Sequence, residues 1–336
     1  MIVDLAWYAL LGFFFAGYLV LAGYDYGIGL LLARGGPAGR RAALTALGPY
    51  FLGNEVWLVA AVGILFGAFP VLEGELLSGC YPAVAGALVG VILVIVGVQL
   101  RSRPTDERIR ARWDRVVVVG SVLAASGWGV LLAALLQGVP RQAAGHVTGM
   151  SHLATPFAAA TALTMLALVA VHGATFLTLR LPAADAAQVG RTARRLVPVA
   201  LTAVALATVV GLLSDRVRDA VQRPAPAVLL PVLLVAALLV ARAALDRRRP
   251  GWALVATGAA LALPVALVGA ALWPYVLVST TDPGASLTVA DAAASAPTLR
   301  LLGWVALPLL PALLGFQAMC WWVFRGRTDG RAPVYW

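Results

Sequence analysis

The sequence predicts an all-α polytopic membrane protein, and its composition and the length of its apolar runs both indicate this fold class. Of the 336 residues, 61% are hydrophobic and only 12% are charged. Soluble domains are about 45–50% apolar and about 25% charged. The apolar runs are about twenty residues or longer, which is the length that a helix needs to cross a bilayer. An outer-membrane barrel would instead show short segments of alternating polarity. A soluble globular domain, a disordered chain and a barrel are therefore excluded.

Nine apolar segments can be drawn, and we expect each of them to be one transmembrane helix. The expected helices cover about 5–33, 46–70, 77–100, 116–137, 153–180, 196–214, 225–245, 252–278 and 299–324. No loop between them is long enough for a soluble domain, so residues 1–336 are expected to form a single membrane-embedded domain. The first four helices and the next four start on the same side of the membrane. This permits two four-helix bundles plus one extra helix.

All 25 basic residues are arginines, and 20 of them lie in the stretches that follow the odd-numbered spans. Cytoplasmic loops concentrate arginine, so we expect the N-terminus outside and the C-terminus in the cytoplasm. The arginines lie between apolar runs and form no basic patch interleaved with aromatic residues. The net charge of +10 therefore does not indicate a nucleic-acid partner.

Two acidic residues lie inside the expected spans and are the first candidate functional residues. Asp25 lies in the first span, within LAGYDYGIGLLLARGG, and Glu55 lies in the second, within GPYFLGNEVWLVAAVG. The first span runs inward and the second returns, so both carboxyls are expected at similar depth in the cytoplasmic half. An ionised carboxylate there costs about 2.5–3.5 kcal/mol on insertion scales. A carboxyl that can be neutral or charged in dry surroundings suits a proton relay. The alternative is that each acid is only hydrogen-bonded and helps the helices to associate.

Four further residues in the spans are candidates for supporting roles. Asn54 could orient Glu55 or bridge to a neighbouring helix. Trp57 is also compatible with ordinary packing. Arg101 ends the third span, and the alternative to a site role is an anchor whose charged end reaches the membrane surface. His172 lies inside the fifth span, where a lone histidine is more often hydrogen-bonded than a ligand.

The histidines and cysteines do not form a pattern typical of a haem or metal site. Haem iron needs an axial ligand and a pocket, and none of the three histidines has a partner at matched depth. Cys80 and Cys320 are expected near opposite faces of the membrane, and no metal-binding spacing of cysteine and histidine occurs. We therefore expect no haem ligand and no metal ligand in this chain.

Several elements of the sequence together resemble subunit II of the cytochrome bd-type quinol oxidases. They are, in order, AGYDYGIGLLLAR, GPYFLGNEVWLVAAVGILFGAFP, LLQGVP, HGATFLTLR, WPYVLVSTTDPGASLTVADA and CWWVFRGR. The resemblance covers nearly the whole chain and implies a multi-pass protein of the bacterial plasma membrane. It implies a haem-free subunit beside a subunit I that holds haems b and d, in a complex that oxidises quinol from the membrane pool and reduces oxygen to water. Protons would come from the cytoplasm along a path partly lined by subunit II. The resemblance leaves open whether the complex has small single-span accessory subunits and whether a quinone binds this chain.

The resemblance also bears on the two acids. Asp25 matches the acid of the family's G-[FY]-D-x-G element, and the family usually carries W-[DE]-x-N-x-V-W in the second span. This chain has FLGNEVW there, with Leu52 in the position of the acid. Glu55 follows three residues later, which is nearly one helical turn. We hypothesise that Glu55 takes over the role of the missing acid.

Two functions from other classes remain open. A proton-coupled secondary transporter would need polar residues near the midplane on broken helices in both halves, and the sixth to eighth spans are almost purely apolar. A structural membrane scaffold would use Asp25 and Glu55 only for helix association. Co-purification with a haem-bearing partner distinguishes the oxidase subunit from the transporter, and substitution of the two acids distinguishes it from the scaffold.

Overall fold

The computed structural model describes residues 2–142 and 145–328. Nine helices in these residues are long and apolar enough to cross a membrane, which confirms the expected number. They are α1 (Ile2–Leu32), α2 (Pro37–Ala68), α4 (Tyr81–Arg101), α5 (Glu107–Leu136), α6 (Pro156–Arg180), α7 (Ala183–Leu213), α9 (Pro224–Asp246), α10 (Pro250–Ala271) and α12 (Ala296–Val323).

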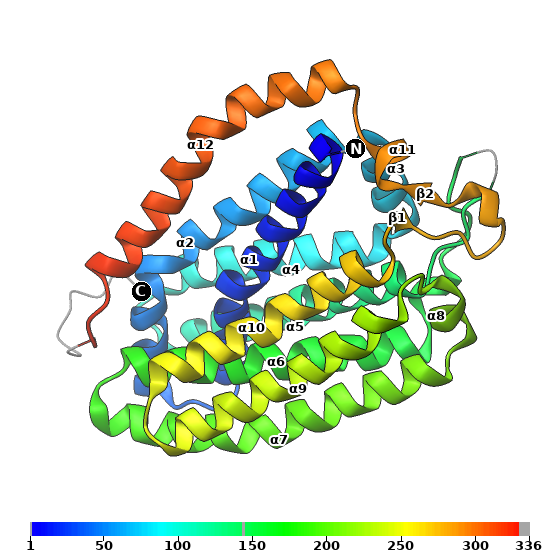
Figure 1. The fold of residues 1–336 in the computed structure, drawn as a ribbon. Helices are drawn as coiled ribbons and strands as arrows, with labels where there is room; N and C mark the ends of the chain where they lie inside the picture. Colours follow the sequence, from blue (N-terminus) through cyan, green and yellow to red (C-terminus); the bar gives the residue numbers. More distant parts are fainter. Residues whose placement is uncertain (1, 143–144, 329–336) are drawn as a thin grey trace.

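Short elements connect the long helices at one end of the molecule, where α1 begins (Figure 1). They are α3 (Pro70–Gly79), η1 (Ser151–Leu153), α8 (Asp215–Ala220), β1 (Tyr275–Leu277), η2 (Pro283–Ala285), β2 (Leu287–Thr288) and α11 (Val289–Ala292). The two strands pair antiparallel, with Tyr275 opposite Thr288 and Leu277 opposite Leu287. We call this the loop end. The opposite end, where α1 ends and Arg101 and Arg180 terminate their helices, is the arginine-rich end.

The long helices pack as two groups of four, with α12 outside both. In the first group, α1 packs against α2 and α5, and α4 packs against α5. In the second, α6 packs against α7 and α10, and α9 packs against α7 and α10. Helices α1 and α5 also contact α6, so the two groups share one buried core. Figure 1 shows α12 at the edge of the molecule beyond α2, which is its main contact. The arrangement confirms two four-helix bundles plus one extra helix.

Four helix boundaries differ by seven residues or more from those expected from the apolar runs, and one of them is the start of α5, which lies at Glu107 rather than near 116. Helix α2 begins at Pro37 rather than near 46, and α7 begins at Ala183 rather than near 196. Alanine and arginine, which are strong helix formers, continue both helices beyond the apolar residues. Helix α10 ends at Ala271 rather than near 278. Pro274 follows it, and a proline disfavours helical backbone at the residue before it. The chain therefore continues into β1 instead.

Helices α1 and α6 cross where neither has room for a side chain. A Cβ atom on Gly27 would lie 1.9 Å from the carbonyl oxygen of Val169, and one on Gly173 would lie 2.5 Å from the carbonyl carbon of Gly27. Such close backbone contact is typical of small residues at helix crossings in membranes. The crossing holds the part of α1 that carries Asp25 against α6.

Substituting Gly27→Ala should destabilise the protein by about 1–3 kcal/mol, because the added methyl overpacks the crossing. The measurement is the thermal unfolding temperature of the purified protein. Gly12→Ala on the same helix is the matched control, since a Cβ there would have nothing within 4 Å. Equal unfolding temperatures for the two variants would show that the crossing is not tightly packed.

Candidate functional site

Asp25 lies in the protein core and is hydrogen-bonded to Asn54 of α2. Its residue surface is 1% exposed, and Asn54 is fully buried. The Asn54 Nδ2 group donates to Oδ1 of Asp25 at 3.2 Å, to Oδ2 at 3.0 Å and to the Leu21 carbonyl oxygen at 3.2 Å. A neutral amide from a neighbouring helix therefore binds this carboxyl.

Tyr24 extends the polar contact toward the arginine-rich end. Its hydroxyl donates to Asn54 Oδ1 at 3.0 Å, and its ring is stacked on Phe176, with centroids 4.3 Å apart. The Trp321 ring lies 6.1 Å from the Tyr24 ring and 5.1 Å from that of Tyr50. We call Tyr24, Tyr50, Phe176 and Trp321 the aromatic cluster. It joins α1, α2, α6 and α12 beside Asn54.

Glu55 follows Asn54 on α2, but its side chain has different surroundings. It is half-buried, and it lies close enough to Asp25, Tyr18 and Tyr26 for electrostatic interaction. The hydroxyls of Tyr18 and Tyr26 are hydrogen-bonded to each other. Leu52 stands at the position where the resembled oxidase family usually has an acid, and it is 53% exposed on the surface of the protein. The structure thus places Glu55 near Asp25, whereas Leu52 faces away from the protein core.

Trp57 is mainly a packing residue. Its ring lies 5.3 Å from that of Phe14 and 5.6 Å from that of Phe13 on α1. Its Nε1–H donates to Oε1 of Gln317 on α12 at 3.4 Å. Trp57 therefore connects α2 with α1 and α12.

His172 joins three helices through both nitrogens of its ring. Nε2 lies 2.9 Å from the Val20 carbonyl oxygen on α1, and Nδ1 lies 2.7 Å from Oγ1 of Thr257 on α10. The hydrogen-bond pattern assigns the proton to Nε2, which donates to the carbonyl, while the Thr257 hydroxyl can donate to Nδ1. A neutral ring satisfies both contacts, and neither nitrogen is left to bind a haem iron.

Arg101 is buried, so its interpretation as an anchor at the membrane surface is wrong. Its Nε group pairs with Oδ1 of Asp114 on α5, and Nη1 of Arg40 on α2 lies 3.2 Å from Oδ2 of the same carboxylate. Asp114 is itself buried. The three residues tie α2, α4 and α5 together at the arginine-rich end.

Four residues around the site were not singled out from the sequence: Asp114, Arg180, Thr257 and Gln317. Asp114 stands in the arginine-rich run ERIRARWDRV and Arg180 ends a span, so both look like residues of a membrane surface. Thr257 and Gln317 are polar residues within long apolar runs, and this position is the feature of the sequence that could have indicated them. Their partners His172 and Trp57 are 85 and 260 positions away in the chain.

No group of three or more His, Cys, Asp or Glu side chains in residues 2–142 and 145–328 could hold a metal ion. At the loop end, Sγ of Cys80 lies 4.0 Å from Nε2 of His152. Burial raises the pKa of the Cys80 thiol to about 12 and lowers the pKa of His152 below its usual value. Both groups are therefore neutral near pH 7.

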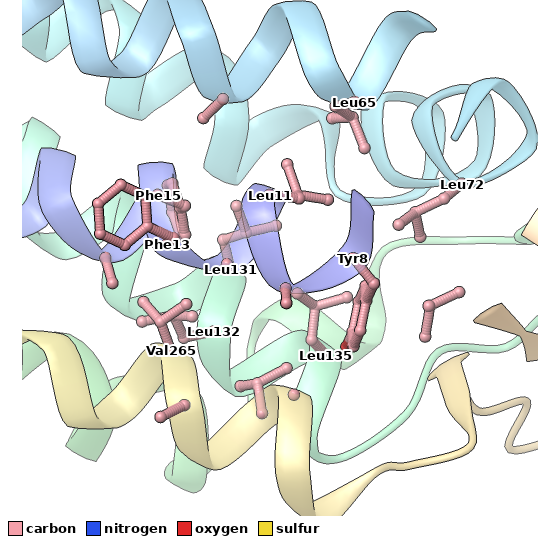
Figure 2. A pocket seen from close by; sticks show the side chains of 18 of the residues that line it. Tyr8, Leu11, Phe13, Phe15, Leu65, Leu72, Leu131, Leu132, Leu135 and Val265 are labelled. Carbon is pink, nitrogen blue, oxygen red and sulfur yellow. The ribbon is translucent and has the colours of Figure 1, made fainter. Parts of the chain in front are cut away.

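An apolar cavity of about 1320 Å³ lies between α1, α2, α5 and α10, toward the loop end. Figure 2 shows Leu11 and Phe15 of α1, Leu65 of α2, Leu131 of α5 and Val265 of α10 among the side chains that line it. These walls suit an acyl or isoprenoid chain. The sequence leaves open whether a quinone binds this chain, and this cavity has the apolar walls that a quinone tail would need.

Comparison with known proteins identifies the family. The family model described as cytochrome bd terminal oxidase subunit II matches residues 3–324. This chain belongs to that family. With nine apolar helices in the part of the chain that the structure describes, and with bacterial relatives, it is a multi-pass protein of the plasma membrane.

Individual relatives agree with this assignment. The chain is 32% identical over 187 residues to cytochrome bd-I ubiquinol oxidase subunit 2 of Escherichia coli (strain K12), which covers 53% of this chain and 49% of that protein. It is 30% identical over 177 residues to cytochrome bd ubiquinol oxidase subunit 2 of Bacillus subtilis (strain 168), which covers 52% of each. The match thus spans about half the length of these curated relatives.

A solved structure of bd oxidase from Geobacillus thermodenitrificans matches with a TM-score of 0.74 and 20% identity, covering 96% of this chain and 99% of that chain. At this identity the match supports the fold.

Substituting Asp114→Asn should destabilise the protein by about 3–5 kcal/mol, because it leaves the buried Arg101 without its counter-charge. The thermal unfolding temperature of the purified protein measures the loss. Asp246→Asn is the matched control, since Asp246 pairs with Arg242 and Arg194 at the surface and an exposed pair contributes about 0–1 kcal/mol. If both variants unfold at the same temperature, the buried ion pair does not stabilise the arginine-rich end.

Proposed function

We propose that this chain is the haem-free subunit II of a cytochrome bd-type quinol:oxygen oxidoreductase, and that Asp25, Asn54 and Tyr24 form part of its proton path. The observation that carries the proposal is a carboxyl 1% exposed, inside a transmembrane helix and bonded to an amide of the next one. Such a residue is costly in a membrane and usually marks a functional path. The partner is a haem-bearing subunit I, which takes its electrons from the quinol pool.

The proposal includes an orientation of the chain in the membrane. Because cytoplasmic loops concentrate arginine, the arginine-rich end faces the cytoplasm and the N-terminus lies outside. Asp25 precedes the end of α1 at Leu32 by seven residues, which is about 10 Å along the helix axis. The carboxyl is then nearer to the cytoplasm than to the exterior, as uptake of protons from within requires.

The hydrogen bonds allow Asp25 to bind and release a proton without rearrangement. The Asn54 amide donates to both oxygens of the carboxylate and favours this charged form, and it still has the carbonyl oxygen to donate to when the other oxygen carries the proton. The Tyr24 hydroxyl holds the amide through its oxygen, and the Leu21 carbonyl holds it through its nitrogen. Glu55 is close enough to Asp25 for electrostatic interaction, so the two carboxyls can act together. A proton that moves between them leaves the charge of the pair unchanged.

The chain's own residues favour a role without haem. His172, the histidine inside the membrane domain, uses both ring nitrogens in hydrogen bonds between helices. The partner's haems supply the oxygen chemistry of the complex. The residues of this chain hold and move protons, and they support the partner subunit.

Substituting Asp25→Asn in the assembled oxidase should lower quinol oxidase turnover by about 10- to 100-fold, because the amide keeps a hydrogen-bonding side chain but cannot carry a proton. Turnover is measured beside the reduced-minus-oxidised spectrum, which should keep its wild-type haem content. Asp185→Asn is the matched control, since Asp185 is exposed at the arginine-rich end. Wild-type turnover in Asp25→Asn at equal haem content would favour the structural scaffold instead.

Substituting Glu55→Gln should lower both turnover and the membrane potential that the oxidase generates. If Glu55 and Asp25 act in one path, the Asp25→Asn Glu55→Gln double variant should be no slower than the slower single variant, since coupled sites are not additive. Wild-type turnover and potential in Glu55→Gln would show that Glu55 has not replaced the acid missing at Leu52. Additive losses would place the two carboxyls on separate paths.

A further inference from the structure

Arg180, the last residue of α6, is a buried cation held by carbonyl oxygens. It is 2% exposed, and no carboxylate of the described residues forms an ion pair with it. Its Nη1 group donates to the carbonyl oxygen of Phe324 at 2.8 Å and to that of Gly326 at 3.4 Å. Its Nε is buried and has no acceptor within the described part of the chain. The main partners of this guanidinium therefore belong to the segment that follows α12.

Three rings of the aromatic cluster surround the same guanidinium. Its central carbon lies 4.9 Å from the ring centroid of Tyr50, 4.9 Å from that of Trp321 and 5.8 Å from that of Phe176. A cation over aromatic faces at these distances is attracted by the ring quadrupoles. Arg180 thus connects the aromatic cluster to the segment beyond α12.

That segment, residues 324–328, which we call the α12 end, is fastened to α6 and α2 by further hydrogen bonds. The backbone N–H of Thr328 donates to the Arg180 carbonyl oxygen at 2.8 Å, and Nη1 of Arg327 donates to that of Leu181 at 2.5 Å. The Tyr50 hydroxyl donates to the Phe324 carbonyl oxygen at 2.5 Å. Elsewhere α12 is attached loosely, since only 6% of its apolar window is buried. The attachment of α12 at the arginine-rich end therefore depends on the contacts around Arg180.

The same contacts reach the proton-path residues through Tyr24. Its ring is stacked on Phe176 and lies beside Trp321, and both of these rings contact Arg180. Its hydroxyl holds the Asn54 amide that binds Asp25. A change at Arg180 that frees Trp321 and the α12 end would therefore loosen Tyr24.

We propose that Arg180 is a positioning residue for proton uptake at Asp25: it fastens the α12 end across the aromatic cluster and thereby holds Tyr24 on Asn54. The proposal rests on the proposed function for its effect on turnover, but the fastening can be measured without activity. Arginine suits this role because its planar guanidinium can donate to two carbonyls while it lies over rings. The ammonium of lysine keeps the charge but lacks this geometry.

The fastening is tested by hydrogen–deuterium exchange of residues 320–328 in the purified complex of both subunits. Arg180→Ala should raise the exchange rate of this segment by about tenfold or more, since local opening becomes easier. Arg180→Lys should fall between Arg180→Ala and the wild type. Arg325→Ala is the matched control and should exchange as the wild type does. Arg325 also donates to a carbonyl, that of Trp322, and lies 5.1 Å from its ring centroid, but both contacts stay within one turn of the chain.

The positioning is tested by the pH profile of quinol oxidase turnover in the same variants. Arg180→Ala should lower turnover less than Asp25→Asn does, and it should shift the pH of half-maximal turnover. Arg180→Lys should restore part of the turnover and part of the pH shift. Tyr50→Phe removes only the hydroxyl that bonds Phe324. It should change the exchange of residues 320–328 and the pH profile in the same direction as Arg180→Ala does, by a smaller amount. It serves as the test if Arg180→Ala does not assemble.

Each outcome decides a separate step. Wild-type exchange at residues 320–328 in Arg180→Ala, or in Tyr50→Phe as its substitute, overturns the fastening. Raised exchange with a wild-type pH profile overturns the positioning of Tyr24. If Asp25→Asn itself keeps wild-type turnover, the proposed function fails, while the exchange measurement still shows whether Arg180 fastens the α12 end.

Discussion

The hydrogen bond from Asn54 to Asp25 is the constraint on which the surrounding structure depends. A carboxyl inside a membrane needs a polar partner within the protein, because lipid offers none. Asn54 can serve only if α2 lies against α1 at this depth and if the amide is itself satisfied. Tyr24 donates to its oxygen, and its nitrogen also donates to the Leu21 carbonyl. This amide therefore constrains how α2 lies against α1 at the depth of Asp25.

The same segment of α1 determines how the second bundle is attached. Gly27 allows the backbone of α6 to approach, and His172 of α6 donates to the Val20 carbonyl almost two turns earlier. Between these two contacts, Phe176 stacks on Tyr24. Polar and apolar contacts therefore alternate along a single crossing. This explains why the α1–α6 interface can be close-packed although it contains buried hydrogen-bonding groups.

The number of spans and the position of Asp25 inside the first of them could be predicted from the sequence, because both are local properties. Apolar runs indicate membrane crossings, and a lone acid within such a run is costly wherever its partners are. The ends of α2 and α7 could not be predicted in the same way, since apolarity reports the membrane rather than the helix. Which of its two expected roles Asn54 takes was also beyond local reasoning. Neighbouring residues on a helix point about 100° apart, so Asn54 faces Asp25 while Glu55 faces another direction. Arg101 looked like a surface residue because its partner Asp114 comes from another helix.

The distribution of groups along α1 bears on the direction of the proposed proton movement. Tyr24, Asp25 and Tyr26 occupy the half nearer the arginine-rich end, whereas Leu11 and Phe15 line the apolar cavity nearer the loop end. A proton that reaches Asp25 from the arginine-rich end therefore meets apolar cavity walls if it continues along α1. A transporter that moves protons across the membrane needs polar groups on both sides of its central site. A polar half joined to an apolar half instead suits uptake from one side, with transfer sideways to a partner, and this is what a supporting subunit of an oxygen-reducing complex requires.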